Sequence, residues 1–246
     1  MALNQISLAA PAYNEAESIE AVVESWVTFL SALPDLECFE IVVCNDGSRD
    51  RTGDILDNLA RRHPQVRPIH MAANQGAAVA LTRAIAGTTL GWVLLIDSDG
   101  QFPISNLPRM MQAVASSGSR AAIGVRPAKQ DSAFARFGSW ASGGLCNLFH
   151  GTRYRDFNSA FKLVDGPLLR AIPLEAKGLN YSTEVTSRIL ERGLSLTEVE
   201  IEHRPRIAGK SSLKLVQGAR DRLLFVLFIG FRQLLLNLKV LQRTTP

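Results

Sequence analysis

The segment that decides the fold is WVLLIDSDGQ, residues 92–101. Its apolar run, Trp92 to Ile96, is followed at once by the carboxylates of Asp97 and Asp99 and by Gln101. Short apolar runs of this kind are typical of strands in a parallel sheet that helices cover on both faces. Ligands bind beyond the carboxyl ends of such strands, so the polar residues after this run are candidates for a binding site.

The same pattern repeats on both sides of this segment. Apolar runs alternate with stretches that have the period of a helix, and this alternation predicts one continuous α/β domain with a mostly parallel sheet. The predicted strands are 6–10, 39–44, 66–71, 92–96 and 121–125, and the predicted helices are 19–29, 54–62, 76–86 and 103–117. Two further polar clusters, 11–15 and 45–48, follow the first two strands and are expected at the same sheet edge.

Composition bounds the protein class. The chain has 246 residues, of which 46% are hydrophobic and 20% charged, so a disordered, collagen-like or coiled-coil protein is excluded. Its three cysteines are too few for a disulfide framework or a four-cysteine zinc site, which favours a reducing compartment. The first basic residue is Arg49, so the N-terminus lacks the basic start of a signal peptide, and we expect a cytoplasmic location.

Charge is distributed unevenly along the chain. Residues 1–202 carry 18 basic and 22 acidic side chains, a net charge of −4, whereas residues 203–246 carry 9 and 1, a net charge of +8. A basic tail indicates an anionic partner such as a membrane surface, phosphates or nucleic acid. Nucleic acid ranks last, because the tail is mostly apolar between Arg222 and Lys239 and would be costly to expose beside a duplex.

The acidic pair that follows the strand 92–96 indicates metal chemistry. Asp97 and Asp99 are two residues apart, so in extended chain their side chains point the same way, and Gln101 continues the row. Two carboxylates and an amide oxygen suit Mg²⁺ or Mn²⁺, and a site with so few protein ligands usually completes its coordination with water and substrate phosphates. The alternative is a structural Asp-rich turn.

The glycine-rich phosphate loops of other nucleotide-binding proteins are missing. No GxGxxG occurs, and Gly209-Lys210-Ser211 lacks the earlier glycine of a P-loop because Arg204 stands at that position. This argues against an NTPase or a dinucleotide-dependent dehydrogenase. Phosphate binding must instead rest on a metal ion and basic side chains.

Six motifs together carry a family resemblance. They are PAYNE (11–15), NDGSRDRT (45–52), NQG (74–76), DSDGQ (97–101), DFNSAFK (156–162) and RIAGKS (206–211). In order and spacing, from about residue 6 to 214, the chain resembles the family 2 glycosyltransferases, in particular their dolichol-phosphate mannose synthase-like branch. The resemblance implies a GT-A fold, a nucleotide-diphosphate sugar as donor, Mg²⁺ or Mn²⁺, and inverting transfer, often to a polyprenyl phosphate.

The resemblance also implies roles for single residues on the donor side. Asp46 is expected to hold the base or ribose, Asp97 to face the nucleotide side of the diphosphate, and Asp99 and Gln101 to bind the metal ion. The remaining nucleotide-binding residues are expected to be Pro11, Tyr13, Glu15 and Ser48. Both GDP-mannose and UDP-sugars remain candidate donors.

On the acceptor side, Arg126, Arg206 and Ser159 match positions that hold an anionic acceptor, and Asp156 is the candidate base. An acceptor phosphate oxygen is already anionic and needs no strong base, whereas a hydroxyl acceptor needs one. Two alternatives therefore stay open: transfer to a saccharide or lipid hydroxyl, and a non-catalytic membrane scaffold that binds nucleotide sugars.

Three positions depart from the family's usual pattern. Asn45 stands where the family often has Asp, Ala160 replaces a usual Gly, and Arg51 replaces a common Gly. Asn45 weakens the assignment of the nucleotide site. Ala160 puts in question how closely a substrate can approach that backbone, because only Gly has no Cβ.

The C-terminal segment forms a separate unit in this prediction, with a GT-A domain at 1–210 and a basic amphipathic helix at 211–246. The apolar stretch 223–241 has Arg232 at its centre, which costs about 2.5–3.5 kcal/mol in a spanning helix. We therefore expect an interfacial helix whose basic side meets anionic headgroups, with the active site at the cytoplasmic face of the membrane. The alternative is a helix packed in a dimer interface or on the domain itself.

Overall fold

The predicted apolar runs form one sheet in the computed structural model, which describes residues 3–127, 133–176, 180–205 and 215–241. Its strands are β1 (Gln5–Ala12), β2 (Cys38–Asn45), β3 (Val66–His70), β4 (Trp92–Leu95), β5 (Ala121–Val125), β6 (Lys162–Asp165) and β7 (Thr197–Glu200). The strand order is β3-β2-β1-β4-β6-β5-β7. All neighbours pair in parallel except β6, which is antiparallel to both β4 and β5.

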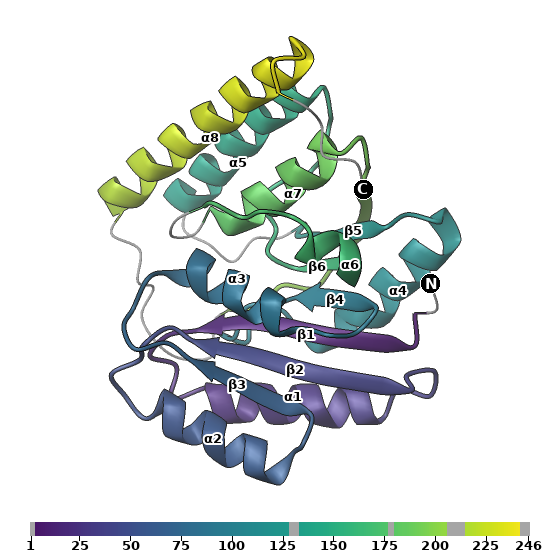
Figure 1. Ribbon diagram of the computed structural model, residues 1–246, viewed down its shortest axis with the longest axis vertical. Coiled ribbons are helices and arrows are strands. Elements are labelled where there is room, and N and C mark those ends of the chain that lie inside the picture. Colours follow the sequence, from purple (N-terminus) through teal and green to yellow (C-terminus); the bar gives the residue numbers. More distant parts are fainter. Residues whose placement is uncertain (1–2, 128–132, 177–179, 206–214, 242–246) are drawn as a thin grey trace.

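Helices cover both faces of this sheet (Figure 1). They are α1 (Ile19–Ser31), α2 (Thr52–Arg62), α3 (Ala77–Gly87), α4 (Leu107–Ser117), α5 (Ala133–His150), α6 (Gly166–Arg170), α7 (Tyr181–Glu191) and α8 (Leu215–Asn237), with a 3-10 turn at Ile104–Asn106. In Figure 1, α1 and α2 lie below β1, β2 and β3, and α3 lies above them. The predicted α/β sheet with helices on both faces is confirmed.

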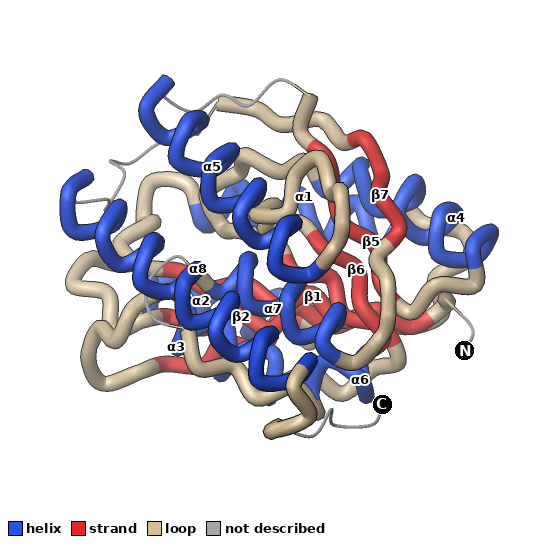
Figure 2. Tube along the Cα trace, turned by 90° about the horizontal axis from the view of Figure 1, so that it is seen from above, coloured by secondary structure: helices blue, strands red, loops and turns tan. Residues whose placement is uncertain are grey.

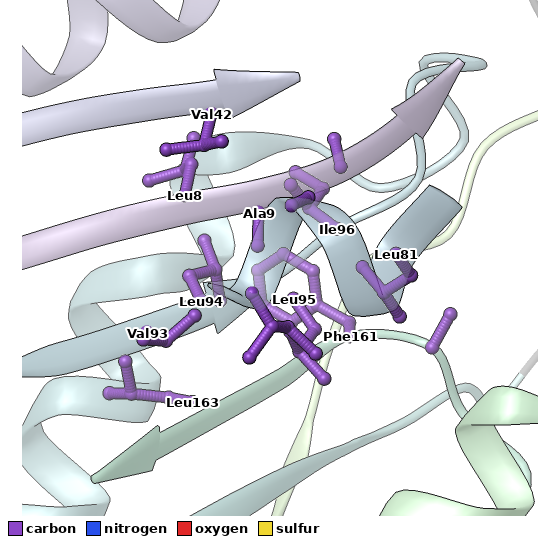
Figure 3. Close-up of a cluster of buried hydrophobic side chains, with 14 of the residues drawn as sticks. Leu8, Ala9, Val42, Leu81, Val93, Leu94, Leu95, Ile96, Phe161 and Leu163 are labelled. Atoms are coloured by element: carbon purple, nitrogen blue, oxygen red, sulfur yellow. The ribbon is translucent and has the colours of Figure 1, made fainter. Parts of the chain in front are cut away.

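The core lies between these layers, and Figure 3 shows its centre. Leu8, Val42 and Leu94 come from three neighbouring strands, Leu81 comes from α3, and Phe161 precedes β6. All five side chains are almost fully buried. Because both faces of the central strands are covered, their sequences are nearly continuous apolar runs, and this is why the sheet could be predicted.

The helix α8 packs on α5 and α7; in Figure 2, α8 and α5 run side by side, with α7 behind them. Its inward residues Val226 and Ile229 join Cys146 of α5 and Phe157 in a second small hydrophobic cluster. Gly230 permits the close approach, because a Cβ there would lie 2.5 Å from a ring atom of Phe149.

The orientation of α8 corrects one expectation. Arg232 does not face outward, because its Nε lies 2.9 Å from a carboxylate oxygen of Glu191 on α7. This side of α8 therefore packs on the domain, which is the alternative considered above. The outward side is apolar and exposes, among others, Leu227, Phe228 and Phe231. Among the residues described, no helix combines the length and the apolar character needed to cross a bilayer.

Candidate active site

The polar clusters that follow β1, β2 and β4 meet at one edge of the sheet. Register places Ala12 beside Asn45, and the N–H of Asp46 donates to the carbonyl of Ala12 at 2.9 Å. The hydroxyl of Ser98 donates to the carbonyl of Pro11 at 2.7 Å, which joins the acidic loop to the first one. The convergence expected from parallel strands is therefore present.

The loops 11–15 and 45–52 form one hydrogen-bonded unit, called the double loop below. The N–H of Asn14 donates to the hydroxyl oxygen of Ser48 at 2.9 Å, and the N–H of Arg49 donates to the side-chain oxygen of Asn14 at 2.8 Å. The N–H of Glu15 donates to Oγ1 of Thr52 at 2.9 Å. Three residues expected to bind the nucleoside, Tyr13, Glu15 and Ser48, thus lie on this double loop, partly exposed.

Asp46 has a structural role in this arrangement. It is 2% exposed, and its carboxylate accepts hydrogen bonds from the N–H groups of Gln75 at 2.7 Å and Gly76 at 2.8 Å and from Nδ2 of Asn74 at 2.8 Å. The carboxylate expected to hold the base or ribose is therefore occupied by the loop before α3. Asp46 thereby holds the second loop and the loop before α3 together.

Gly47 allows the second loop to lie directly against the segment before α3. Its φ of +63° falls in the left-handed region, and a Cβ at this position would be 2.5 Å from the backbone carbon of Ala73. Both conditions restrict the position to glycine.

Three further hydrogen bonds fix the acidic loop after β4, residues 97–101. An oxygen of Asp97 accepts from the hydroxyl of Tyr181, and Oδ1 of Asp99 accepts from the N–H of Gln101 at 3.0 Å. The backbone N–H of Arg204 donates to the carbonyl of Gln101 at 2.8 Å, so the segment after β7 crosses this edge. Arg206, expected on the acceptor side, lies outside the described residues.

The acidic loop has the ligand chemistry of a divalent cation site. Asp97, Asp99 and Gln101 offer carboxylate and amide oxygens, the ligands that Mg²⁺ and Mn²⁺ prefer. Within the described ranges, no three His, Cys, Asp or Glu side chains are grouped closely enough to bind a metal ion alone. Two carboxylates and one amide oxygen fit an ion that takes the rest of its ligands from water and a bound diphosphate.

Asp156 and Arg126 form a buried ion pair beyond this loop. Nε of Arg126 lies 2.7 Å from Oδ2 of Asp156, and Nη2 and the backbone N–H of Arg126 add bonds of 3.2 and 3.3 Å. The side chains are 1% exposed for Asp156 and 11% for Arg126. The candidate base and a candidate acceptor-binding arginine are thus brought together and bound to each other.

Ser159 and Lys162 lie in the interior of the same segment. Ser159 is fully buried, and its hydroxyl has no hydrogen-bond partner among the described residues. The ammonium group of Lys162 donates to the carbonyl of Ser159. Burial lowers the pKa of Lys162 to about 7, although the charges of Asp156 and Asp97 oppose this shift.

Tyr181 and Lys162 were not singled out from the sequence. Tyr181 begins α7, which is 84 residues from Asp97, and no spacing rule links the two. Glu184, on the same helix, is a buried structural carboxylate, since it accepts from the N–H groups of Glu175 and Ala176 and from Arg188.

Comparison with known proteins decides the family. A sequence model described as glycosyl transferase family 2 matches residues 7–174. The chain belongs to this family. It is a glycosyltransferase, and the resemblance drawn from the six motifs is confirmed.

Two relatives show how far the family 2 likeness extends. The glycosyltransferase AglD of Haloferax volcanii is 28% identical over 219 residues, which are 87% of this chain and 35% of AglD. The undecaprenyl-phosphate mannosyltransferase of Micrococcus luteus is 28% identical over 213 residues, which are 82% of this chain and 85% of that protein. The chain therefore spans about a third of AglD but most of the Micrococcus luteus protein.

Solved structures show the fold. The glucosyl-3-phosphoglycerate synthase of Mycobacterium tuberculosis, crystallised with Mn²⁺, uridine-diphosphate-glucose and phosphoglyceric acid, matches 94% of this chain and 81% of its own, with a TM-score of 0.74 and 19% identity. This family 2 chain therefore has the GT-A fold that the resemblance implied.

Proposed function

We propose that this chain transfers a sugar from a nucleoside diphosphate sugar to a polyprenyl phosphate at a membrane surface. Family membership supplies the reaction class. The undecaprenyl-phosphate mannosyltransferase of Micrococcus luteus aligns with 82% of this chain and supports the acceptor class. GDP-mannose and UDP-sugars both remain candidate donors.

The ion pair between Arg126 and Asp156 is the observation that favours a phosphate acceptor over a hydroxyl acceptor. Transfer to a hydroxyl requires a base that removes its proton, and Asp156 is the candidate for that task. In this structure its carboxylate is committed to three N–H donors of Arg126. A phosphate acceptor needs no strong base, and Arg126, Arg206 and Ser159 are the residues proposed to hold it.

On the donor side, the double loop of the first two clusters is proposed to bind the nucleoside, and the acidic loop to bind the diphosphate with Mg²⁺ or Mn²⁺. When bound, the ion supplies positive charge beside the departing diphosphate. The chain's own residues orient the donor so that the acceptor oxygen attacks from the opposite face. The proposed donor-side residues are Pro11, Tyr13, Glu15, Ser48, Asp97, Asp99 and Gln101, and Asp46 is proposed to act through the loops that its carboxylate holds together.

Exposed apolar side chains on two adjacent helices support the membrane as the place of reaction. Among the described residues, the large hydrophobic side chains that are clearly exposed lie on α5 or on α8 and the turn after it, including Trp140 at 72%, Leu148 at 74% and Phe231 at 61%. These two helices pack together on the outer side of α7 (Figure 2). A patch confined to two adjacent helices matches shallow insertion into a bilayer.

The location at the cytoplasmic face is part of the same proposal. All three cysteines are unpaired, as is usual for proteins of reducing compartments. The proposal therefore places the apolar face of α5 and α8 on the cytoplasmic leaflet.

The acceptor is tested with two lipids that differ only in the phosphate. The purified chain, with Mn²⁺ and labelled GDP-mannose or UDP-glucose, is offered a polyprenyl phosphate or the matching polyprenol. We expect label in the lipid phase with the phosphate alone. Label on the polyprenol or on a saccharide would support a hydroxyl acceptor, and donor binding without transfer to any of them would favour the scaffold alternative.

The membrane surface is tested by vesicle sedimentation. We expect the paired change Phe228→Ser with Phe231→Ser to weaken binding to anionic vesicles. The control pair, Asn58→Ser with Arg61→Ser, has the same spacing on α2, across the sheet, and should leave binding unchanged. If both pairs sediment alike and light scattering shows a dimer that the Phe changes dissociate, the face is a dimer interface instead.

A further inference from the structure

Asn45, which stands where the family often has Asp, contacts the side chain of His70. These residues end β2 and β3 and lie beside each other in the parallel register. Oδ1 of Asn45 accepts from the N–H of Ser48 at 3.0 Å, and its Nδ2 lies 3.1 Å from Nδ1 of His70. The other ring nitrogen, Nε2, lies 3.0 Å from Oδ1 of Asp57 on α2. A chain of contacts thus leads from a surface carboxylate to the loop that contains Ser48.

Donor and acceptor chemistry allows one assignment for this chain. The backbone N–H of Ser48 can only donate, so Asn45 must present its amide oxygen to Ser48 and its amide NH₂ to His70. Nδ1 of His70 must then accept, and it carries no proton. The ring proton therefore resides on Nε2 and is donated to Asp57.

We propose that His70, as the neutral ring protonated at Nε2, is a positioning residue for the nucleotide site. It orients the amide of Asn45, which fixes Ser48, whose hydroxyl accepts from the N–H of Asn14. This inference rests on the proposed function, because it takes the double loop of the first two clusters as the site of the donor. His70 itself does not touch the substrate.

Protonation of the ring would break this arrangement. A proton on Nδ1 would face the NH₂ of Asn45, two donors 3.1 Å apart. Rotating the amide would satisfy His70 but would turn NH₂ toward the N–H of Ser48. Asn45 can therefore serve both neighbours only while the ring is neutral, and protonation of the ring costs the loop a hydrogen bond.

The surroundings of the His70 ring contain few charged groups. The His70 side chain is 38% exposed. Both α2 and β2 pack on β3, and Gly87 at the end of α3 accepts a hydrogen bond from Arg67 of β3. From α2, Asp57 contacts the ring, and Asp54 lies one turn earlier without a hydrogen bond to it. From β2 the ring meets the uncharged Asn45, and Asp46, the next residue, is bound by the loop before α3.

The experiment combines nitrogen NMR of the full chain with calorimetry of UDP and of GDP in the presence of Mn²⁺. We expect the ring nitrogens to report a proton on Nε2 at about pH 7.5, and the amide signal of Ser48 to titrate together with the ring at lower pH. Nucleotide affinity should fall by a factor of about 2 to 10 once the ring is protonated.

Two variants separate the role of the ring from that of the loop. His70→Asn places an amide oxygen close to the position of Nδ1 and does not titrate, so affinity should lose this pH dependence. The nucleotide phosphate titrates in the same range, so the readout is the ratio of wild-type to variant affinity at each pH. Asn45→Asp should reverse the sign, because a carboxylate accepts from both Ser48 and a protonated His70.

The outcomes are distinguishable. A proton on Nδ1 at neutral pH, or a Ser48 amide that does not follow the ring, overturns the proposal even if nucleotide binds normally. If the Ser48 amide follows the ring but neither nucleotide binds, the proposed function fails, and with it the role of His70 in nucleotide binding. In that case the NMR result shows that the hydrogen-bond chain from His70 to Ser48 exists, and that the assignment of the donor site is wrong.

Discussion

The hydroxyl of Tyr181 donates a hydrogen bond to the carboxylate of Asp97, so the first residue of α7 fixes the first residue of the acidic loop. Burial, followed by the charge of Asp97, raises the pKa of Tyr181 well above its ordinary value. The phenol therefore remains a donor across the pH range of a folded protein. It holds the carboxylate that is proposed to face the diphosphate.

Replacing this phenol tests its effect on the donor site. We expect Tyr181→Phe to weaken nucleotide binding in the presence of Mn²⁺ by a factor of about 3 to 10, because Asp97 loses a donor while the ring keeps its packing. Tyr154→Phe is the control, since that hydroxyl accepts from the N–H of Leu196 instead. Calorimetry measures both, and equal losses in the two variants would contradict the prediction.

Breaking the buried ion pair should reduce stability. Arg126→Gln or Asp156→Asn leaves one buried charge without its partner, and each is expected to lower the free energy of unfolding by about 3–5 kcal/mol. The double variant should lose less than the sum of the two. Urea denaturation provides the comparison. Strictly additive losses would show that the pair is not coupled.

Lys162 should make stability depend on pH. Its pKa is lowered from 10.5 to about 7 by burial, so between these values the unfolded chain binds a proton that the folded chain has released. The cost of burying the charge is complete below pH 7 and is relieved as the pH rises. Relative to Lys162→Met, the wild-type free energy of unfolding should therefore rise from pH 7 to 9 by up to about 1 kcal/mol per unit. A constant difference between the two proteins in urea denaturation would refute this.

Gly47 lies in the second loop, and Gly118, which follows α4, is a control glycine for substitutions at Gly47. Both have positive φ, +63° and +64°, but a Cβ at Gly47 would meet the backbone of Ala73, whereas a Cβ at Gly118 would meet nothing within 4 Å. Gly118→Ala should cost only the backbone strain, about 1–2 kcal/mol. Gly47→Ala should cost more and should also weaken nucleotide binding. Equal unfolding curves would exclude a role for the contact with Ala73.

The sheet and its loop edge were predictable because each feature is local in sequence. The run 92–96 is buried on both faces and is followed directly by Asp97 and Asp99. The apolar pattern therefore predicts the strand, and the direction of the strand predicts the sheet edge at which the carboxylates lie. The antiparallel strand β6 was not predicted, because its four residues follow an irregular segment in which the α/β alternation has ended.

The remaining features of the site depend on contacts between distant segments. His70 lies 25 residues from Asn45, and the direction of their hydrogen bond follows from Ser48, which the sequence alone does not place. The sequence predicts a basic side for the C-terminal helix, but it does not show whether Arg232 has a carboxylate opposite it. In the fold that carboxylate is Glu191.

The cluster that α8 forms with Phe157 also limits how this enzyme can be altered. Phe157 is the neighbour of Asp156 in the chain, and Val226 and Ile229 of α8 pack against it. Deleting α8 to obtain a more soluble catalytic fragment would therefore uncover the support of the acceptor-side ion pair. Single substitutions on the outer surface of the helix, which leave these inner contacts in place, are the safer route to a protein that handles well in solution.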